Sequence, residues 1–506
     1  MRKVLVYIGS HDNNSINAAI ERLEAGDDVY VIRCDRSTGI CRHNVYGSQC
    51  ICRYCEHVNN SLWERRMLQM GAKIKGLQFL ILPEDRKVAE SFHFSYENVD
   101  ELKAVKYKTV EVGFGAFSTY VTITRNVMPE FCEEFKRYID YVIRKEIVVI
   151  NAIERELVAF KPDLVIFHNG RFAEFKPILG LTQKHHIPYI TTEEIYSNGV
   201  MLKNNFENAV VHSVEANYQK IIDNWERGLE SEEEKKKIGE EFYYRRAKGK
   251  AAGDKVYTAQ QVKGLLPESF DETVENIAIY NSSEDEFCAV SSEYDKNMLF
   301  KNQYIALKTI FDHYKNDKTK HFYLRVHPNL RDVPYRSHTA LYDLHYENVT
   351  IISADSPIDS YVLLFHSDKI ITFHSTMSIE GAFWGKPVIA LDRYVWNLMD
   401  VVYSPKSVEE LWGYIDTPKL PCKKNENVYK FGYRILHPIE DVEDRIEILR
   451  REYVFFKKYH SYPYNFFRLL GSYRLNAFVT ILLKTNFFRR LFRRDFQFDR
   501  LPCTIV

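Results

Sequence analysis

The sequence predicts an α/β protein in which two Rossmann-like domains face each other across a cleft, with a helical connector and a basic helical tail. Three observations lead to this fold class. Strand-length apolar runs alternate with helical segments up to about residue 190, a highly charged stretch follows, and the alternation restarts at residue 276. Strands separated by helices indicate βαβ units and a parallel sheet, so two such series indicate two domains.

The first series contains five strand-like runs and two helical segments. Strands are expected at residues 3–9, 28–33, 77–82 and 164–167, and a fifth opens at 187–190. Helices are expected at 15–25, where apolar residues recur with helical spacing, and from about residue 171 to 186.

The second series repeats this pattern. Strands are expected at residues 276–280, 321–326, 349–352, 369–373 and 388–391, and helices at 303–313 and 377–384. We therefore assign residues 1–214 to the first domain, with a cysteine-rich insertion at 34–55, and residues 271–440 to the second. Residues 215–270 form the connector, and residues 441–506 form the helical tail.

Composition and charge exclude some classes of protein. The 506 residues are 45% hydrophobic and 27% charged, with a formal net charge of +0, which argues against a nucleic-acid binder. No window holds the roughly 18 apolar residues that a membrane span needs. The N-terminus leads directly into a strand rather than a secretory signal, so we expect a cytoplasmic protein.

Polar residues follow two neighbouring strands of the second series. Arg325 and His327 lie at the end of one strand, and Ser375 and Thr376 follow the other. Ligands of open α/β sheets bind outside the carboxyl ends of the strands. A cation, an imidazole and two hydroxyls at a helix start predict a phosphate site. The alternative is that His327 belongs to a simple turn and that the hydroxyls only cap a helix.

Glu380 lies about one turn into the helix that begins near residue 377. Its carboxylate either reaches the ribose hydroxyls of a nucleotide or faces solvent.

The first series offers residues for the other side of a cleft. Asn169, Gly170 and Arg171 follow a strand, and glycine there allows close backbone approach to a ligand. Arg171 is suited to hold a phosphate or a carboxylate. Glu193 and Glu194 follow the next strand, and one of them is a candidate general base for an acceptor hydroxyl. The alternative is a pair of surface carboxylates.

Five of the nine cysteines lie within residues 34–55. Cys52 and Cys55 form a C-x-x-C pair, and Cys34 and Cys41 would complete a closed, structural zinc site. Buried thiols without metal are the alternative, and an iron–sulfur cluster is a lesser one.

As a set, these motifs resemble bacterial capsule polysaccharide biosynthesis proteins, which are glycosyltransferases of the two-Rossmann (GT-B) type. The likeness spans roughly residues 160 to 395 and the first strand. It is carried by Arg325-x-His327-Pro328, 359–361, 368–371, Ser375-Thr376, Glu380, 385–389, 281–286 with Gln303, and 169–171 with Glu193 and Glu194. The motifs are shared with Kdo- and sialic-acid-type transferases and with polyol-phosphate polymerases of teichoic acid synthesis.

The resemblance implies that His327, Ser375 and Thr376 contact the phosphate or nucleotide of a donor, and we expect Ser282 and Ser283 to do so as well. It implies transfer of a sugar from a nucleotide-activated donor to a growing surface polysaccharide, on a glycan or lipid-linked acceptor. No catalytic divalent metal is required if side chains neutralise the phosphate. Three alternatives stay open: a glycerol- or ribitol-phosphate transferase, a nucleotide-sugar epimerase, and a non-enzymatic adaptor of a polysaccharide assembly complex.

The C-terminal tail joins aromatic and arginine pairs at helical spacing. From residue 466 to 506 there are eight basic and two acidic residues, a local net charge of 8 − 2 = +6. A basic amphipathic segment is typical of peripheral binding to a membrane, here the inner face of the cytoplasmic membrane. A final helix that packs back on the first domain is the alternative.

Overall fold

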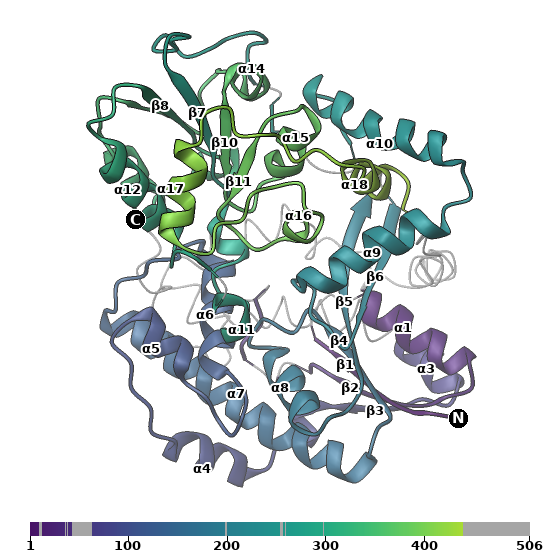
Figure 1. The fold of residues 1–506 in the computed structure, drawn as a ribbon. Coiled ribbons are helices and arrows are strands. Elements are labelled where there is room, and N and C mark those ends of the chain that lie inside the picture. The colour runs from purple at the N-terminus through teal and green to yellow at the C-terminus, as the bar shows by residue number, and fades with distance from the viewer. Residues whose placement is uncertain are drawn as a thin grey trace, which may run out of the picture.

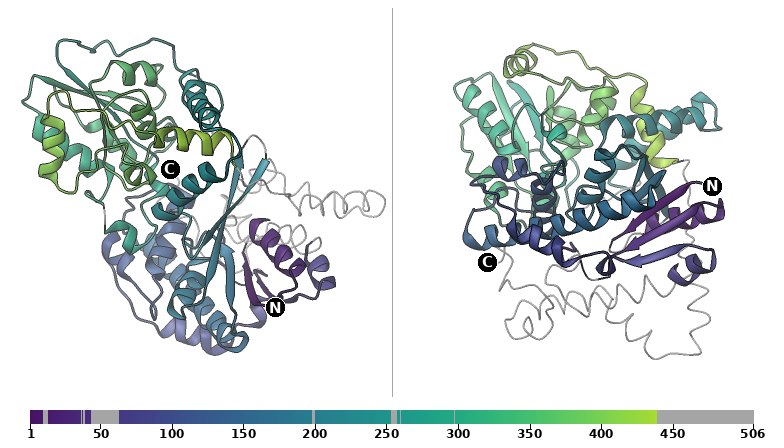
Figure 2. Two further views of the ribbon diagram at one scale, coloured as in Figure 1. Left: turned by 45° about the vertical axis from the view of Figure 1, so that its right-hand side comes forward. Right: turned by 90° about the horizontal axis from the view of Figure 1, so that it is seen from below.

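The computed structural model describes two parallel-sheet domains that lie side by side (Figures 1 and 2). It describes residues 1–9, 13–35, 37, 39–42, 63–197, 200–252, 257–258, 260–296 and 298–438. Most of the cysteine-rich insertion and the whole tail 441–506 lie outside the described residues. No helix in the described part of the chain is long and apolar enough to span a bilayer.

The first domain contains a six-stranded sheet with the order β3-β2-β1-β4-β5-β6. All neighbours pair in parallel except β5 and β6, which form an antiparallel hairpin. The strands are β1 (Lys3–Ile8), β2 (Asp28–Arg33), β3 (Lys73–Gly76), β4 (Leu164–His168), β5 (Tyr189–Ser197) and β6 (Val200–Glu207). The order 3-2-1-4-5 of its parallel strands is that of a Rossmann-like sheet.

The second domain contains a five-stranded sheet, fully parallel, with the order β11-β10-β7-β8-β9. The strands are β7 (Glu275–Tyr280), β8 (Lys320–Arg325), β9 (Val349–Ile352), β10 (Lys369–Thr372) and β11 (Val388–Ala390). Read along the chain, this is again 3-2-1-4-5, and its topological switch point lies between β7 and β10. The predicted fold class of two Rossmann-like domains is confirmed.

One predicted strand is wrong. Residues 77–82 are not a strand: β3 ends at Gly76, and a short 3-10 helix, η2 (Leu77–Phe79), follows it. Pro83 then opens helix α4 (Pro83–Ser91), as proline favours the first helical turn. The sequence analysis took an apolar loop for a strand because β3 itself is a short edge strand with exposed lysines.

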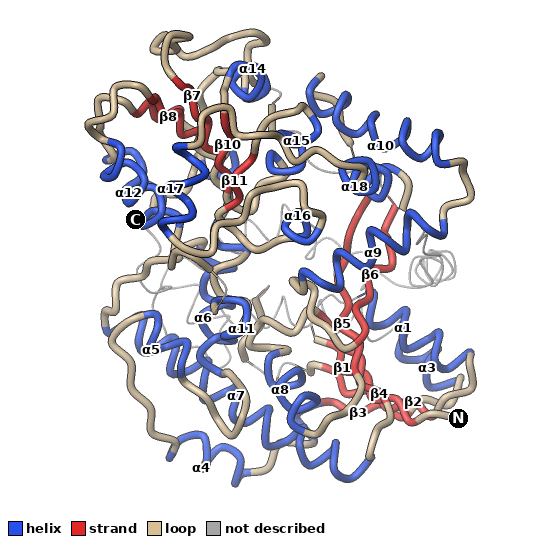
Figure 3. Tube along the Cα trace, viewed as in Figure 1, coloured by secondary structure: helices blue, strands red, loops and turns tan. Residues whose placement is uncertain are grey.

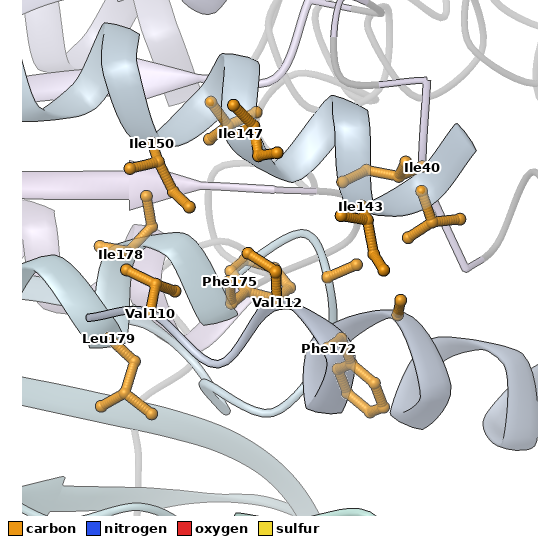
Figure 4. Packing of buried hydrophobic residues seen from close by; sticks show 14 of the residues in the cluster. Ile40, Val110, Val112, Ile143, Ile147, Ile150, Phe172, Phe175, Ile178 and Leu179 are labelled. Carbon is orange, nitrogen blue, oxygen red and sulfur yellow. The ribbon is translucent and has the colours of Figure 1, made fainter. Parts of the chain in front are cut away.

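Alternate residues of β1 and β2 face opposite sides of the first sheet, and helices cover both sides. Val4, Val6 and Ile8 pack with Ile16 of α1 and Met67 of α3. Leu5 and Tyr7 face the other layer, whose packing Figure 4 shows. The helices of this domain are α1 (Asn13–Glu24), α3 (Arg65–Gln69), α4, α5 (Val99–Ala104), α6 (Val112–Thr124), α7 (Glu133–Phe160) and α8 (Lys176–Lys184).

The second sheet is also covered on both sides. Ile277 and Ile279 pack with α12 (Gln303–Tyr314) and α17 (Val408–Asp416), whereas Ala278 and Tyr280 face the opposite layer. That layer contains α14 (Ser360–His366), α15 (Met377–Phe383) and α16 (Val395–Leu398), together with α9 (Val214–Arg227), α10 (Glu232–Ala247) and α18 (Asn427–Leu436). The connector helices are thus part of the second domain's packing (Figure 3).

Short helices occupy several loops of the second domain. They are η3 (Glu284–Glu286), α11 (Ser292–Asp295), η4 (Pro328–Leu330), α13 (Arg336–Thr339) and η5 (Ala340–Asp343).

Helices α10 and α18 cross at two glycines. A Cβ atom on Gly239 would lie 2.3 Å from the carbonyl oxygen of Tyr429, and one on Gly432 would lie 2.2 Å from the carbonyl oxygen of Gly239. Backbone atoms cannot move aside as a flexible side chain can. Close contact between these helices therefore requires glycine at both positions, and it fixes where the C-terminal end of α10 lies.

We predict that Gly239→Ala lowers the free energy of unfolding by about 1–3 kcal/mol, because the added methyl group overpacks this crossing. Gly413→Ala in α17 is the matched control, since its Cβ meets nothing within 4 Å. Alanine should there stabilise the helix by about 0.5–1 kcal/mol. Urea denaturation monitored by circular dichroism measures both. Equal stabilisation by the two substitutions would contradict the close crossing.

Candidate functional site

A pocket opens at the carboxyl ends of β7, β8 and β10, beside the switch point of the second sheet. It encloses about 630 Å³, counting space that is open to solvent. Its lining residues are Arg246, Lys250, Tyr257, Thr258, Gln261, Tyr280, Asn281, Arg325, His327, Pro328, Ser360, Tyr361, Ser375, Thr376 and Met377. The structure therefore brings Arg325, His327, Ser375 and Thr376 together, as the sequence predicts.

Arg325 lies at the end of β8 and is buried, with 3% of its surface exposed. Its Nη1 donates to the carbonyl of Ser353, its Nη2 to that of Ser356 at 3.3 Å, and its Nε to Ser360 Oγ at 3.3 Å. Burial lowers the pKa of Arg325, but arginine normally titrates far above neutral pH, so the charge persists. No described carboxylate lies within ion-pair distance of it, so the charge is not cancelled locally.

His327 is held by the side chain of Asn281 and by the backbone of Asn329. Its N–H donates to Asn281 Oδ1 at 2.8 Å, and its ring Nδ1 accepts the N–H of Asn329 at 3.2 Å. Burial, and then the charges of Arg325, Arg125 and Arg246, lower the pKa of His327 to about 4. The ring is neutral at pH 7 with its proton on Nε2, because Nδ1 is an acceptor. No described residue bonds Nε2, which is left to donate to a ligand.

Ser375 and Thr376 follow β10 and begin α15. Ser375 Oγ accepts the N–H of Met377 at 3.3 Å, which is a local cap. Thr376 Oγ1 accepts a hydrogen bond of 3.0 Å from Nη2 of Arg246. The capping alternative thus describes part of what Ser375 does, and both hydroxyls also line the pocket.

Glu380 is fully buried and does not line the pocket. Its Oε1 accepts from Nε of Arg246 at 2.9 Å, and its Oε2 accepts from the hydroxyl of Tyr361. In this arrangement the carboxylate orients Arg246 toward Thr376. A direct contact between Glu380 and a nucleotide stays a prediction.

Arg246 is the main pocket residue that the sequence analysis missed. It lies in the last turn of α10, next to the half-buried Arg245, within a charged helix that is typical of a solvated connector. Only the packing of α10 against α18 and α15 turns its side chain inward. Tyr257 and Gln261 were also missed, because they lie in the predicted connector and belong to no motif.

The lining residues give the pocket a positive charge. Arg246, Lys250 and Arg325 are cations, and none of the described lining residues is a carboxylate. With the neutral Nε2–H of His327 and the hydroxyls of Ser375 and Thr376, the pocket offers donors to an anion with two or more oxygens.

Ser282 and Ser283 lie in the loop after β7 and border an adjoining cavity or the first domain. Ser282 Oγ accepts from Gln303 Nε2 at 3.1 Å. Ser283 Oγ accepts from Arg125 of the first domain and donates to Asp285. Neither serine lines the pocket of His327.

The predicted residues of the first domain form a separate group beside the end of β4. Asn169, Gly170 and Arg171 follow β4, whereas Glu193 and Glu194 lie within β5, which runs on to Ser197, and not after the strand as predicted. Asn169, in a left-handed conformation with φ 51°, donates from Nδ2 to Oε2 of Glu193. Glu193 Oε1 lies 3.8 Å from Nε2 of His168, which is buried. Gly170 also has a positive φ, of 86°, which suits glycine. The side chain of Glu194 is outside the described part of the structure.

Arg171 turns toward the second domain rather than into open space. Its Nη1 donates to the carbonyl of Glu286 at 2.5 Å, and its Nη2 lies 3.4 Å from Thr122 Oγ1. Burial lowers the pKa of Arg171. Its observed contact is thus with the loop after β7, and binding of an acceptor anion stays a prediction.

The structure does not test the predicted zinc site. Cys34 and Cys41 are half-buried, whereas Cys52 and Cys55 lie outside the described residues. Within the described ranges, no three His, Cys, Asp or Glu side chains are grouped as metal ligands.

Comparisons with known proteins find likeness only among solved structures. No family model and no curated protein matches the sequence. The beta Kdo 2,4 transferase KpsC of Thermosulfurimonas dismutans is 16% identical, with a TM-score of 0.35 over 56% of this chain and 86% of that chain. A UDP-GlcNAc 2-epimerase from Neisseria meningitidis, bound to UDP-GlcNAc, is 14% identical, with a TM-score of 0.25 over 89% and 99%. A glycosyltransferase from Streptomyces sp. SF2575, complexed with thymidine diphosphate, is 9% identical, with a TM-score of 0.20 over 90% and 99%.

We predict that the ring of His327 stays neutral between pH 8 and 5 and titrates with a pKa of about 4. Since the unfolded chain protonates this histidine near its ordinary pKa of 6.5, the folded state binds fewer protons between pH 6.5 and about 4. The free energy of unfolding should therefore fall as the pH falls through that window. NMR of protein with isotope-labelled histidine measures the titration, with His327→Gln to assign the signal. A His327 midpoint above pH 6 would contradict the neutral donor.

Proposed function

We propose that the chain is a glycosyltransferase that transfers a sugar from a nucleotide-activated donor to a growing capsular or other surface polysaccharide. The observation that carries the proposal is the pocket at the carboxyl ends of β7, β8 and β10. It combines cations, a neutral imidazole donor and hydroxyls, and its described lining includes no carboxylate. Such a lining suits the diphosphate of a nucleotide-sugar.

The pocket is suited to the charge that develops during transfer. When the bond between the sugar and the phosphate breaks, negative charge grows on the departing nucleotide. Donors that are already in place stabilise this charge most effectively, because nothing has to reorganise during the reaction. Arg246, held by Glu380, and Nε2–H of His327 supply such donors without a divalent metal.

The first domain supplies a candidate base for the acceptor. Glu193 has 26% of its side chain exposed, and it lies within β5, beside His168 and Asn169 at the end of β4. In the proposed reaction its carboxylate takes the proton from the attacking hydroxyl. Glu194 remains the alternative base. The tail 441–506 is proposed to hold the protein on the inner membrane surface, near a lipid-linked acceptor, and the cysteine-rich insertion is proposed to bind a structural zinc.

We predict that Arg246→Ala weakens binding of the nucleotide-sugar roughly 10- to 100-fold, because a charged hydrogen bond is worth about 1.5–3 kcal/mol. Arg245→Ala is the matched control, since Arg245 is its neighbour on α10 but has 43% of its side chain exposed, pairs with Glu241 at 2.8 Å and does not line the pocket. Isothermal titration with CMP-, CDP-, UDP- and GDP-linked compounds, CDP-glycerol and CDP-ribitol included, measures the affinity.

The same panel separates the proposed function from its rivals. Transfer from CDP-glycerol or CDP-ribitol would indicate a polyol-phosphate transferase, and conversion of a nucleotide-sugar without an acceptor would indicate an epimerase. If no compound in the panel binds, or if the Arg245 and Arg246 variants lose affinity equally, the proposed donor site is wrong.

We predict that Glu193→Gln lowers kcat about 10²- to 10⁴-fold, the usual contribution of a general base, and leaves donor affinity unchanged. Glu207→Gln, at the exposed end of β6, is the control and should retain full activity. Initial rates with the donor identified above measure both. Full activity of Glu193→Gln would exclude Glu193 as the base and leave Glu194 to be tested.

A further inference from the structure

Arg125 is a residue of the first domain that reaches into the second. It follows α6 directly and adopts a left-handed backbone conformation with φ 61°, which residues other than glycine rarely adopt. Its N–H donates to the carbonyl of Val121, and the left-handed conformation at this position ends the helix. Residues held in such a conformation cluster at functional sites.

The guanidinium of Arg125 contacts two loops of the second domain at once. Nη1 donates to the carbonyl of Asn329 at 2.9 Å, in the turn after β8. Nη2 donates to Ser283 Oγ at 2.5 Å, and Nε lies 3.4 Å from Oδ2 of Asp285, both in the loop after β7. The planar fork of arginine allows these bonds to form together, which a lysine ammonium at the end of a flexible stem does not reproduce.

Both loops control the position of His327. The N–H of Asn329, whose carbonyl Arg125 holds, donates to Nδ1 of His327. Asn281, at the start of the other loop, accepts the backbone N–H of His327. Arg125 therefore bonds directly to Asn329, whose N–H fixes both the tautomer and the orientation of the imidazole. Arg125 is not itself among the residues that line the pocket.

We propose that Arg125 is a positioning residue of the donor pocket: from the opposite domain, it fixes the His327 turn relative to the loop after β7, so that Nε2–H points at the donor phosphate. This proposal rests on the proposed function, because it assigns a role in binding the donor.

Other cations of the first domain hold the same loop, which makes Arg125 part of a larger anchor. Arg171 donates to the carbonyl of Glu286, Lys103 to that of Cys288, and Lys176 to that of Val290 at 3.0 Å. Ala289 is buried within the apolar core of the first domain. The loop belongs to the second domain by sequence and to the first by its contacts. Among these described cations, only Arg125 also bonds the turn of His327.

The test uses Arg125→Ala and Arg125→Lys in the full-length protein, with two measurements for each variant. The first is the pKa of His327 by NMR, and the second is donor affinity by calorimetry. The charge of Arg125 lowers the pKa of His327, so Arg125→Ala should raise this pKa, and Arg125→Lys should leave it close to that of the native protein. Both variants should lose donor affinity, by about tenfold for the alanine variant, because neither holds the two loops together.

Lys301→Ala is the matched control. Lys301 forms another ion pair between the domains, at 2.5 Å with Asp100, but both side chains are exposed and neither lines the donor pocket. This variant should change neither the His327 pKa nor the donor affinity.

The outcomes separate the two proposals. If the native protein binds no nucleotide-sugar, the proposed function fails and the positioning role in donor binding falls with it, even if the pKa of His327 shifts. If the native protein binds but Arg125→Ala binds equally well, the positioning role alone is wrong. Equal losses in Arg125→Ala and Lys301→Ala would also overturn it, since the effect would then come from loosened domains. If the alanine variant fails to fold, native affinity in Arg125→Lys would still refute the proposal.

Discussion

The parallel order of β7, β8 and β10 is the constraint on which the candidate site depends. Parallel strands end at one edge of a sheet, so residues that are far apart along the chain are brought together there without any contact between their own segments. Asn281, His327 and Ser375 come from three separate loops of this kind. A different strand order would separate these side chains even if the sequence of each loop stayed the same. The strand order therefore determines the site more than any single motif does.

The pocket must also keep a positive charge where it faces a ligand, while the buried arginines still find hydrogen-bond partners. A buried guanidinium without partners is costly, and a carboxylate partner in the pocket would cancel its attraction for an anion. The structure meets this requirement in two ways. Arg325 donates to backbone carbonyls, which carry no net charge. Arg246 is paired with Glu380, but that carboxylate lies behind it, outside the lining, so the face toward the pocket stays cationic.

The sequence predicts the second sheet well because buried parallel strands leave continuous apolar runs that end in polar turns. β9 begins and ends at the predicted residues, and so does β2 in the first sheet. The edge strand β3 leaves no such run. Arg246 could not be found for a different reason: its sequence neighbourhood is that of a solvated helix, and its role arises only from the crossing of α10 with α18. Glu380 is the opposite case. It belongs to a motif that suggested a ligand contact, but its carboxylate forms a buried ion pair with Arg246.

The contacts of Arg125 and Arg171 extend this argument to the relation between the domains. A sequence reading treats each Rossmann-like domain as a unit with its own strand-end residues, and it assigns Arg171 to the first domain's side of the cleft. In the structure both arginines donate to the loop after β7 instead. The second domain's sheet sets where this loop begins, and the first domain's cations set where it lies. The geometry around His327 is therefore a joint property of both domains, which neither sequence half contains by itself.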